Sequence, residues 1–135
     1  MNDSTFNSAE YFQKIYARPV ILETKRLSQV FKHGKTERTV LNQLDLKIHK
    51  REFICVIGPS GCGKSTLSRV IAGLDPYHSG EILVDGEAIT GPSPERGMVF
   101  QGYTLFPWKT VKENVMFGPR MKGASQMTAE ANARE

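Results

Sequence analysis

The chain has 135 residues, of which 18 are Lys or Arg and 14 are Asp or Glu, so its formal net charge is +4. This length allows one domain with a buried core, and the apolar runs are far shorter than the ~20 residues of a membrane-spanning helix. The basic residues form short scattered groups without interleaved aromatic residues, which favours solvated loops over a nucleic-acid surface, so no nucleic-acid partner is predicted.

The first residues of the chain predict a small appendage. MNDSTFNSAE lacks a basic head followed by an apolar segment, so it does not have the pattern of an export signal. A short amphipathic helix is expected from the spacing of Tyr11, Phe12, Ile15 and Tyr16. We interpret residues 1–19 as an N-terminal extension of a domain that covers residues 20–135.

A strand is predicted for residues 21–30, with Phe31 directly after it. The stretch KHGKTERT then separates Phe31 from Val40 and has the character of an insertion. From the residues alone, Phe31 can be an ordinary core phenylalanine that closes this strand.

The stretch GPSGCGKST, Gly58–Thr66, lies between a predicted strand and a predicted helix. Residues 52–57 form a short apolar, partly β-branched run, which is typical of a strand buried on both faces. The helix is predicted from four apolar residues at helical spacing, Leu67, Val70, Ile71 and Leu74. Gly73 and Asp75-Pro76 provide the signal that ends it. The order strand, loop, helix with the pattern G-x-x-x-x-G-K-[ST] indicates a phosphate-binding P-loop.

Each residue type in this loop suits a nucleoside triphosphate. Glycines let successive N–H groups turn toward phosphate oxygens, and the helix N-terminus adds partial positive charge. Lys64 would reach the β- and γ-phosphates, Ser65 would place its hydroxyl on Mg²⁺, and Thr66 would bond phosphate. The predicted binding residues are Gly58, Pro59, Ser60, Gly61, Cys62, Gly63, Lys64, Ser65 and Thr66. The alternative is a Gly-Ser turn that happens to precede a helix.

The two cysteines, Cys55 and Cys62, lie in the predicted strand and in the loop directly after it. A disulfide would have to tie a strand interior to a tight turn, so two reduced thiols and a cytosolic setting are predicted.

The dipeptide Asp85-Gly86 lies between the apolar stretches EILV and EAI, which predicts a two-residue hairpin. Residues 82–85 also have the pattern of an apolar strand followed by a metal-binding aspartate, and Glu87 is nearby. The hairpin interpretation is preferred. Later in the chain, residues 97–100 predict a buried strand that ends at Gln101, and residues 128–135 predict a helix with an N-cap at Thr128.

Three stretches carry a resemblance to a known family: GPSGCGKSTLSRVIAGL, SGEILVDGEAITGPSPERGMVFQ and FQGYTLFPWKTVKENVMFG. From about Leu22 onward, the chain resembles the ATP-binding subunits of ABC transporters. The combination of FQ, LFPW and TVKENV is most similar to the branch that serves importers of nitrate, sulfonates, taurine and related small anions. The resemblance implies an α/β fold, namely a P-loop NTPase nucleotide-binding domain with an antiparallel β subdomain.

The resemblance also assigns residues to ATP and Mg²⁺. Phe31 would stack on adenine, a contact worth ~1–3 kcal/mol, and Val40 would touch the base or ribose edge. Gln101 would join Ser65 as a Mg²⁺ ligand and would approach the attacking water. Lys64 and Gln101 would contribute to catalysis, but no complete catalytic set is expected, because the family's LSGGQ-like signature, Walker B aspartate, glutamate base and switch histidine do not occur. Gln101 as a plain strand-edge residue stays open.

The resemblance implies ATP hydrolysis that powers import of a small anion by the full-length protein. The expected partners are a transmembrane permease subunit, contacted through residues 101–108, and a second ATP-binding subunit in a homodimer at the cytoplasmic face of the inner or plasma membrane. The chain is expected to be C-terminally truncated and inactive alone. Core burial of Leu105 and Phe106 competes with the permease surface. Two other interpretations are a truncated nucleotide-binding remnant and a P-loop enzyme outside transport, such as a GTPase or small-molecule kinase. The sequence has no Asn-Lys-x-Asp motif, with which a GTPase would recognise guanine.

Overall fold

The computed structural model describes residues 7–102 and 104–134. These residues fall into two compact units, which we call the N-terminal unit (Met1–Ser93) and the C-terminal unit (Pro94–Glu135). None of the helices in the described part of the chain has the length and apolar character that a membrane crossing requires.

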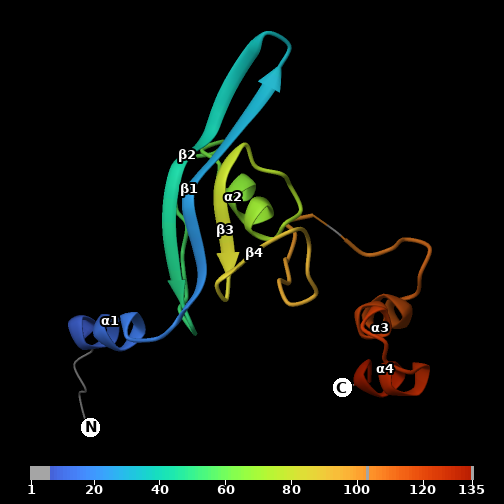
Figure 1. Ribbon diagram of the computed structural model, residues 1–135. Coiled ribbons are helices and arrows are strands. Elements are labelled where there is room, and N and C mark those ends of the chain that lie inside the picture. The colour runs from blue at the N-terminus through green and yellow to red at the C-terminus, as the bar shows by residue number, and fades with distance from the viewer. Residues whose placement is uncertain (1–6, 103, 135) are drawn as a thin grey trace. The chain divides into compact units, whose positions relative to one another are not determined.

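The N-terminal unit is built on an antiparallel sheet with the strand order β2-β1-β3-β4 (Figure 1). The strands are β1 (Val20–His33), β2 (Thr36–His49), β3 (Ser79–Val84) and β4 (Glu87–Ala88). Strand β1 pairs with β2 on one side and with β3 on the other. The β1–β2 and β3–β4 pairs are hairpins of consecutive strands, whereas the pairing of β1 with β3 joins segments that β2 and α2 separate in the chain.

Strands β1 and β2 form one long hairpin, and its tip is the stretch that has the character of an insertion in the sequence. Phe31 lies inside β1 and pairs with Arg38 of β2, so its expected position directly after the end of the strand is wrong. The register shifts here, because Gln29 pairs with Leu41 whereas Val30 pairs with Thr39. Val40 is therefore the extra residue of a β-bulge, a feature that re-aims side chains near functional sites.

The predicted N-terminal helix is confirmed as α1 (Ser8–Tyr16). The side chain of Asn7 caps it by accepting a hydrogen bond from the N–H of Glu10. Ile15 is buried, and the ring of Tyr16 meets that of His49 edge-on at 5.2 Å. These contacts attach the appendage to the end of β2.

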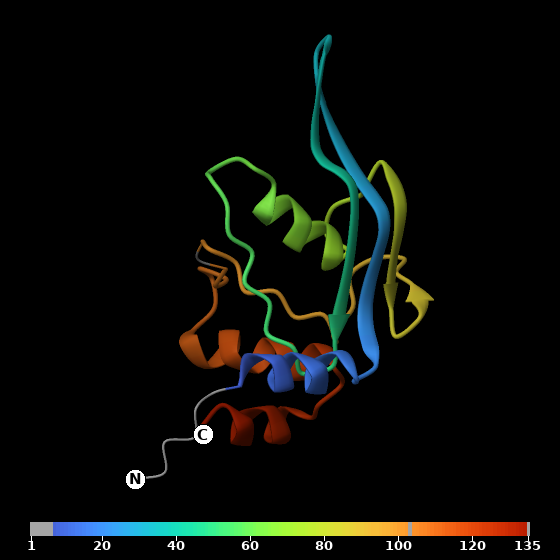
Figure 2. The same ribbon diagram turned by 90° about the vertical axis from the view of Figure 1, so that its left-hand side faces the viewer.

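The predicted helix after the loop is also confirmed, as α2 (Lys64–Ile71), which lies on one face of the sheet (Figure 2). The buried core joins this helix to three strands and consists of Leu27, Leu41, Leu67, Val70 and Ile82. The helix ends at Ala72, and Gly73 follows with a left-handed φ of 76°. A Cβ at Gly73 would lie 2.4 Å from the carbonyl oxygen of Gly91, so only glycine fits there.

The Asp85-Gly86 hairpin is confirmed. Both residues have positive φ, 50° and 84°, as a two-residue turn of the mirror-image type requires. Val84 pairs with Glu87 directly across this turn. Asp85 is therefore a turn residue between antiparallel strands.

Two predicted strands are not formed. Residues 52–57 and 97–100 have no strand structure, and Phe53 and Val99 are 88% and 97% exposed. An apolar run buried on both faces needs strands beside it and layers above and below. Among the described residues no strand pairs with either run, so the sequence pattern alone cannot bury them.

The C-terminal unit contains α3 (Val111–Met121) and α4 (Gln126–Asn132), which contact each other. Met116 of α3 and Ala129 of α4 are buried. The sequence analysis missed α3, although Thr110 and Glu113 form a capping box whose spacing is readable in the sequence. Helix α4 begins before the predicted N-cap: Ser125, not Thr128, is the cap, and its side chain accepts from the N–H of Thr128.

Candidate nucleotide site

The loop of residues 58–66 leads into α2 through a position that only glycine can occupy. Gly63 is the N-cap of α2, with φ of 104°, and a Cβ added to it would lie 2.9 Å from Cγ1 of Val40. Gly61 also has a positive φ, 76°. Because Gly63 has no side chain to cap α2, the first N–H groups of this helix are left for an anion.

Lys64, the first residue of α2, curls back over the loop. Its Nζ donates hydrogen bonds to the carbonyl oxygens of Gly58 and Pro59, both at 2.7 Å, and lies 3.8 Å from Sγ of Cys62. The loop therefore holds the ammonium group at its centre through neutral acceptors. A phosphate that enters the loop meets a positive charge that no carboxylate of the described residues neutralises.

The first glycine of the loop is closely covered. A Cβ at Gly58 would lie 2.8 Å from Sγ of Cys62, so the loop is wound tightly around the Lys64 ammonium. Both Cys55 and Cys62 are free thiols, as predicted.

The β1–β2 hairpin brings three further residues to the loop or to the same face. Val40, at the bulge, contacts the backbone of Gly63. Arg38 donates from Nη2 to the carbonyl oxygen of Gly61 at 3.2 Å. Phe31 pairs with Arg38, and directly paired side chains of antiparallel strands share one face of the sheet. Phe31 is 46% exposed, so the interpretation as a core residue is wrong.

Arg38 is the residue that the sequence analysis missed at this site. Its distance from the loop in the chain is 23 residues, and only the cross-strand register and the bulge place it there. The sequence does contain a signal for it, because Arg38 is a basic residue two positions before Val40, which is predicted to contact the nucleotide.

The two predicted Mg²⁺ ligands lie in different units. Ser65 is exposed in the first turn of α2, and Gln101 is exposed after residues 97–100 in the C-terminal unit. Thr66 is partly buried beside Ser65. A Mg²⁺ ion shared by Ser65 and Gln101 therefore stays a prediction.

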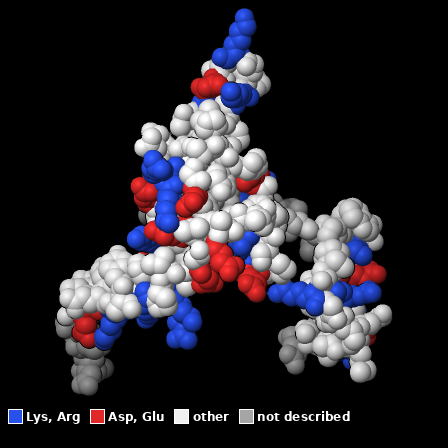
Figure 3. Space-filling model, viewed as in Figure 1, with Lys and Arg blue, Asp and Glu red and all other residues white. Residues whose placement is uncertain are grey.

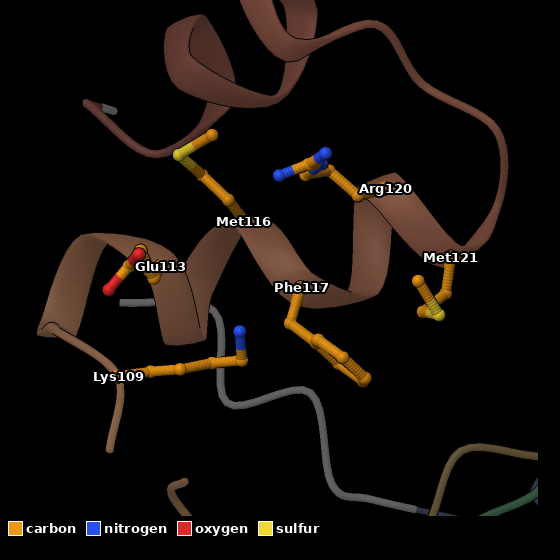
Figure 4. Close-up of a pocket in the computed structure, with 6 residues that line it drawn as sticks. All are labelled: Lys109, Glu113, Met116, Phe117, Arg120 and Met121. Atoms are coloured by element: carbon orange, nitrogen blue, oxygen red, sulfur yellow. The ribbon is translucent and has the colours of Figure 1, made fainter. Parts of the chain in front are cut away.

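The C-terminal unit has a pocket of its own, with a volume of about 300 Å³ (Figure 4). It is lined by Lys109, Glu113, Met116, Phe117, Arg120 and Met121. The ring of Phe117 packs on that of Phe106 at 4.6 Å, and Nζ of Lys109 lies 6.0 Å from the Phe117 centroid. The pocket thus combines an aromatic and methionine surface with basic side chains.

The segment expected to contact the permease, residues 101–108, borders this pocket. Asn114 fixes it to α3, because its side chain accepts from the N–H of Phe106 at 2.8 Å and donates to the Phe106 and Lys109 carbonyl oxygens. Leu105 and Trp108 are exposed, so core burial of Leu105 is wrong, whereas Phe106 is partly buried. Tyr103 lies outside the described residues.

Glu113 orders the start of α3 at the rim of the same pocket. Hydrogen bonds from the backbone N–H and then the hydroxyl of Thr110 hold the pKa of the Glu113 carboxyl below its ordinary value. Glu113 therefore stays charged at the helix N-terminus, where a negative charge is favourable.

Comparison with known proteins gives consistent matches. The sequence matches the ABC transporter family over residues 41–135. It is 50% identical over 105 residues to the nitrate import ATP-binding protein NrtD of Synechocystis sp., which is 78% of this chain and 40% of the relative. It is 46% identical over 104 residues to the uncharacterized ABC transporter ATP-binding protein MJ0412 of Methanocaldococcus jannaschii, with 77% and 39% covered.

The fold matches a solved structure as well. The dimeric structure of a post-hydrolysis state of the ATP-binding cassette MJ0796 bound to ADP and Pi superposes with a TM-score of 0.75 at 29% identity, covering 84% of this chain and 54% of that one. The chain spans about two fifths of the length of these two curated relatives. With a family match over most of its residues and this structural likeness, the chain belongs to the ABC transporter family and has the fold of its ATP-binding cassette.

Proposed function

We propose that residues 58–66 of this chain bind the phosphates of ATP. The observation that carries the proposal is the position of the Lys64 ammonium group, which lies within hydrogen-bond distance of two loop carbonyl oxygens and has no acidic partner among the described residues. The tight contact of Val40 with Gly63 supports it, because a cradle in which no Cβ fits lets backbone N–H groups approach a phosphate closely.

The residues at the loop fit Mg²⁺ as well as phosphate. Ser65 offers an exposed hydroxyl oxygen, a hard ligand of the kind that Mg²⁺ prefers, and Gln101 is the second ligand that we propose. When bound, Mg²⁺ supplies positive charge that offsets the negative charge of the phosphates. Lys64 adds its own positive charge, and Phe31 and Val40 hold the base and ribose.

For the whole protein we propose ATP hydrolysis that drives import of a small anion of the nitrate, sulfonate or taurine kind. The support is the similarity to a nitrate import ATP-binding protein. We place the contact with a transmembrane permease subunit at residues 101–108 and at the adjoining pocket of α3. Exposed apolar side chains such as Trp108 favour a partner surface. This partner puts the protein at the cytoplasmic face of the membrane.

We also propose that two ATP-binding subunits pair. The support is the dimeric cassette to which the fold is similar. In such a pair the second subunit would complete a site to which this chain contributes the P-loop.

Titration with a fluorescent ATP analogue tests the phosphate-binding role of the loop. We expect Lys64→Ala to weaken binding by one to two powers of ten, because it removes a charge-assisted contact worth ~1.5–3 kcal/mol. Lys35→Ala is the matched control, since Lys35 is an exposed lysine in the β1–β2 turn. Equal affinities for the wild type and Lys64→Ala would contradict the proposal.

A further inference from the structure

Arg38 is the second cationic side chain that contacts the loop. It comes from β2, and its Nη2 donates to the carbonyl oxygen of Gly61 at 3.2 Å, in the middle of the loop whose end carries Lys64. The bulge at Val40 fixes this placement, because Val40 is held against Gly63 only two residues farther along β2. The guanidinium group is therefore attached to the loop by a defined strand.

In the part of the chain that the structure describes, no carboxylate neutralises the charge of Arg38. Basic side chains gather at the outer end of the β1–β2 hairpin (Figure 3). Lys32 there pairs with Glu37, at 2.7 Å. Arg38 forms no ion pair among residues 7–102 and 104–134, and its guanidinium group donates to the neutral carbonyl oxygen of Gly61. Arg38 and Lys64 are thus two cations at one loop whose partners among the described residues are neutral.

The chemistry of the guanidinium group leaves it free to bind an anion in addition. Arginine has five N–H donors in a planar fork, and the Gly61 carbonyl oxygen uses one of them. This fork matches the oxygens of a phosphate group, often with two hydrogen bonds. Phe31 lies on the same face of the hairpin, directly across from Arg38. A ligand that stacks on Phe31 and ends in the loop passes the guanidinium group.

We propose that Arg38 is a further ligand-contacting residue, which binds the phosphate chain of the nucleotide beside the loop. This inference rests on the proposed function of residues 58–66. It adds a residue that the loop motif does not contain, and it predicts that affinity depends on the hairpin as well as on the P-loop.

The test compares Arg38→Ala, Arg38→Lys and Lys35→Ala in the full chain. Binding of the fluorescent ATP analogue is measured at several salt concentrations, and circular dichroism confirms that each variant is folded. We expect Arg38→Ala to weaken binding about tenfold, Arg38→Lys to restore part of the loss, and Lys35→Ala to equal the wild type. The salt dependence of binding falls in Arg38→Ala, because screening acts on the lost charge–charge contact.

The outcomes separate the two proposals. If the wild type binds no ATP, the proposed function of the loop is wrong, and the role of Arg38 with it. If the wild type binds and Arg38→Ala binds equally well, only the role of Arg38 is wrong. If Arg38→Ala binds the ATP analogue weakly but keeps the salt dependence of the wild type, Arg38 acts only by positioning Gly61 and does not contact the phosphates. This result also overturns the inference.

Discussion

Val40 covers the backbone of Gly63 so closely that a Cβ built on Gly63 would lie 2.9 Å from Cγ1 and 3.0 Å from the carbonyl oxygen of Val40. Gly63→Ala therefore meets two obstacles, a steric clash and a left-handed φ of 104°. We expect this variant to lose ATP binding and to lower the melting temperature, because the entry of α2 must shift away from β2.

Gly123→Ala separates the clash from the backbone strain. Gly123 also has a positive φ, 87°, but a Cβ there would meet nothing within 4 Å. We expect Gly123→Ala to lose about 1–2 kcal/mol of stability from strain alone while keeping wild-type affinity for the fluorescent ATP analogue. The contact between Val40 and Gly63 would be disproved as the cause if both variants retained ATP binding equally.

The sequence predicted those elements whose signals are local. The P-loop motif, the helix after it and the Asp85-Gly86 turn are each specified by a few neighbouring residues, and the structure has all three. The helix α3 was equally readable from Thr110 and Glu113. What depends on distant partners was not predictable: the position of Arg38 follows from strand register and a bulge.

The failure of the two predicted strands has the same physical origin. Residues 52–57 carry an apolar pattern that is adapted to neighbours on both sides. A strand, unlike a helix, takes its backbone hydrogen bonds from another segment. The apolar pattern indicates that these residues are suited to a strand with neighbours on both sides. No strand among the described residues pairs with them, and Phe53 and Ile57 are exposed.

Phe31→Ala tests whether the aromatic ring serves the base. Stacking does not depend on exocyclic groups. We therefore expect the variant to weaken the binding of adenine and guanine nucleotides alike, by an amount corresponding to ~1–3 kcal/mol. Because Phe31 is nearly half exposed, the melting temperature should change little. The measurement is competition of ATP and GTP against the fluorescent analogue, beside a thermal melt. An unfolded variant would instead make Phe31 a structural residue.

Arg69 and Asp75 give the end of α2 a pH-dependent contribution. Nε and Nη2 of Arg69 each donate to one carboxylate oxygen of Asp75 at 2.7 Å. These hydrogen bonds hold the pKa of Asp75 below its ordinary value of 3.8. The folded state then binds the proton less tightly than the unfolded state, so the stabilisation is present above pH 3.8 and is lost as the pH falls through the lowered pKa.

Asp75→Asn should therefore be less stable than the wild type at neutral pH. The difference between the two should shrink as the pH falls below the ordinary pKa of the carboxyl group. Denaturant midpoints measured from neutral to acidic pH check this, with Asp85→Asn as a control, since Asp85 lies in a hairpin turn where asparagine is equally suitable. A stability difference that stays constant over this pH range would refute the role of the ion pair.

ATP hydrolysis by a polypeptide of these 135 residues requires more than the loop. Phosphoryl transfer to water needs a group that positions or activates the water, besides charge around the phosphates. The loop supplies the charge through Lys64, and residues 118–135 contain neither an LSGGQ-like signature nor an apolar strand followed by adjacent aspartate and glutamate. We expect this polypeptide to bind Mg·ATP but to release phosphate at the background rate.

Two measurements on the same sample decide the matter. ATP should raise the melting temperature by an amount that follows ~RT ln(1 + [L]/Kd), because it binds only the folded state. Phosphate release should be the same for the wild type and for Lys64→Ala, since the step that Lys64 supports does not proceed. Steady release that disappears in Lys64→Ala would mean that these residues contain a group able to activate water. The search for it would then begin with carboxylates near the loop, because a general base must reach the water within hydrogen-bond distance.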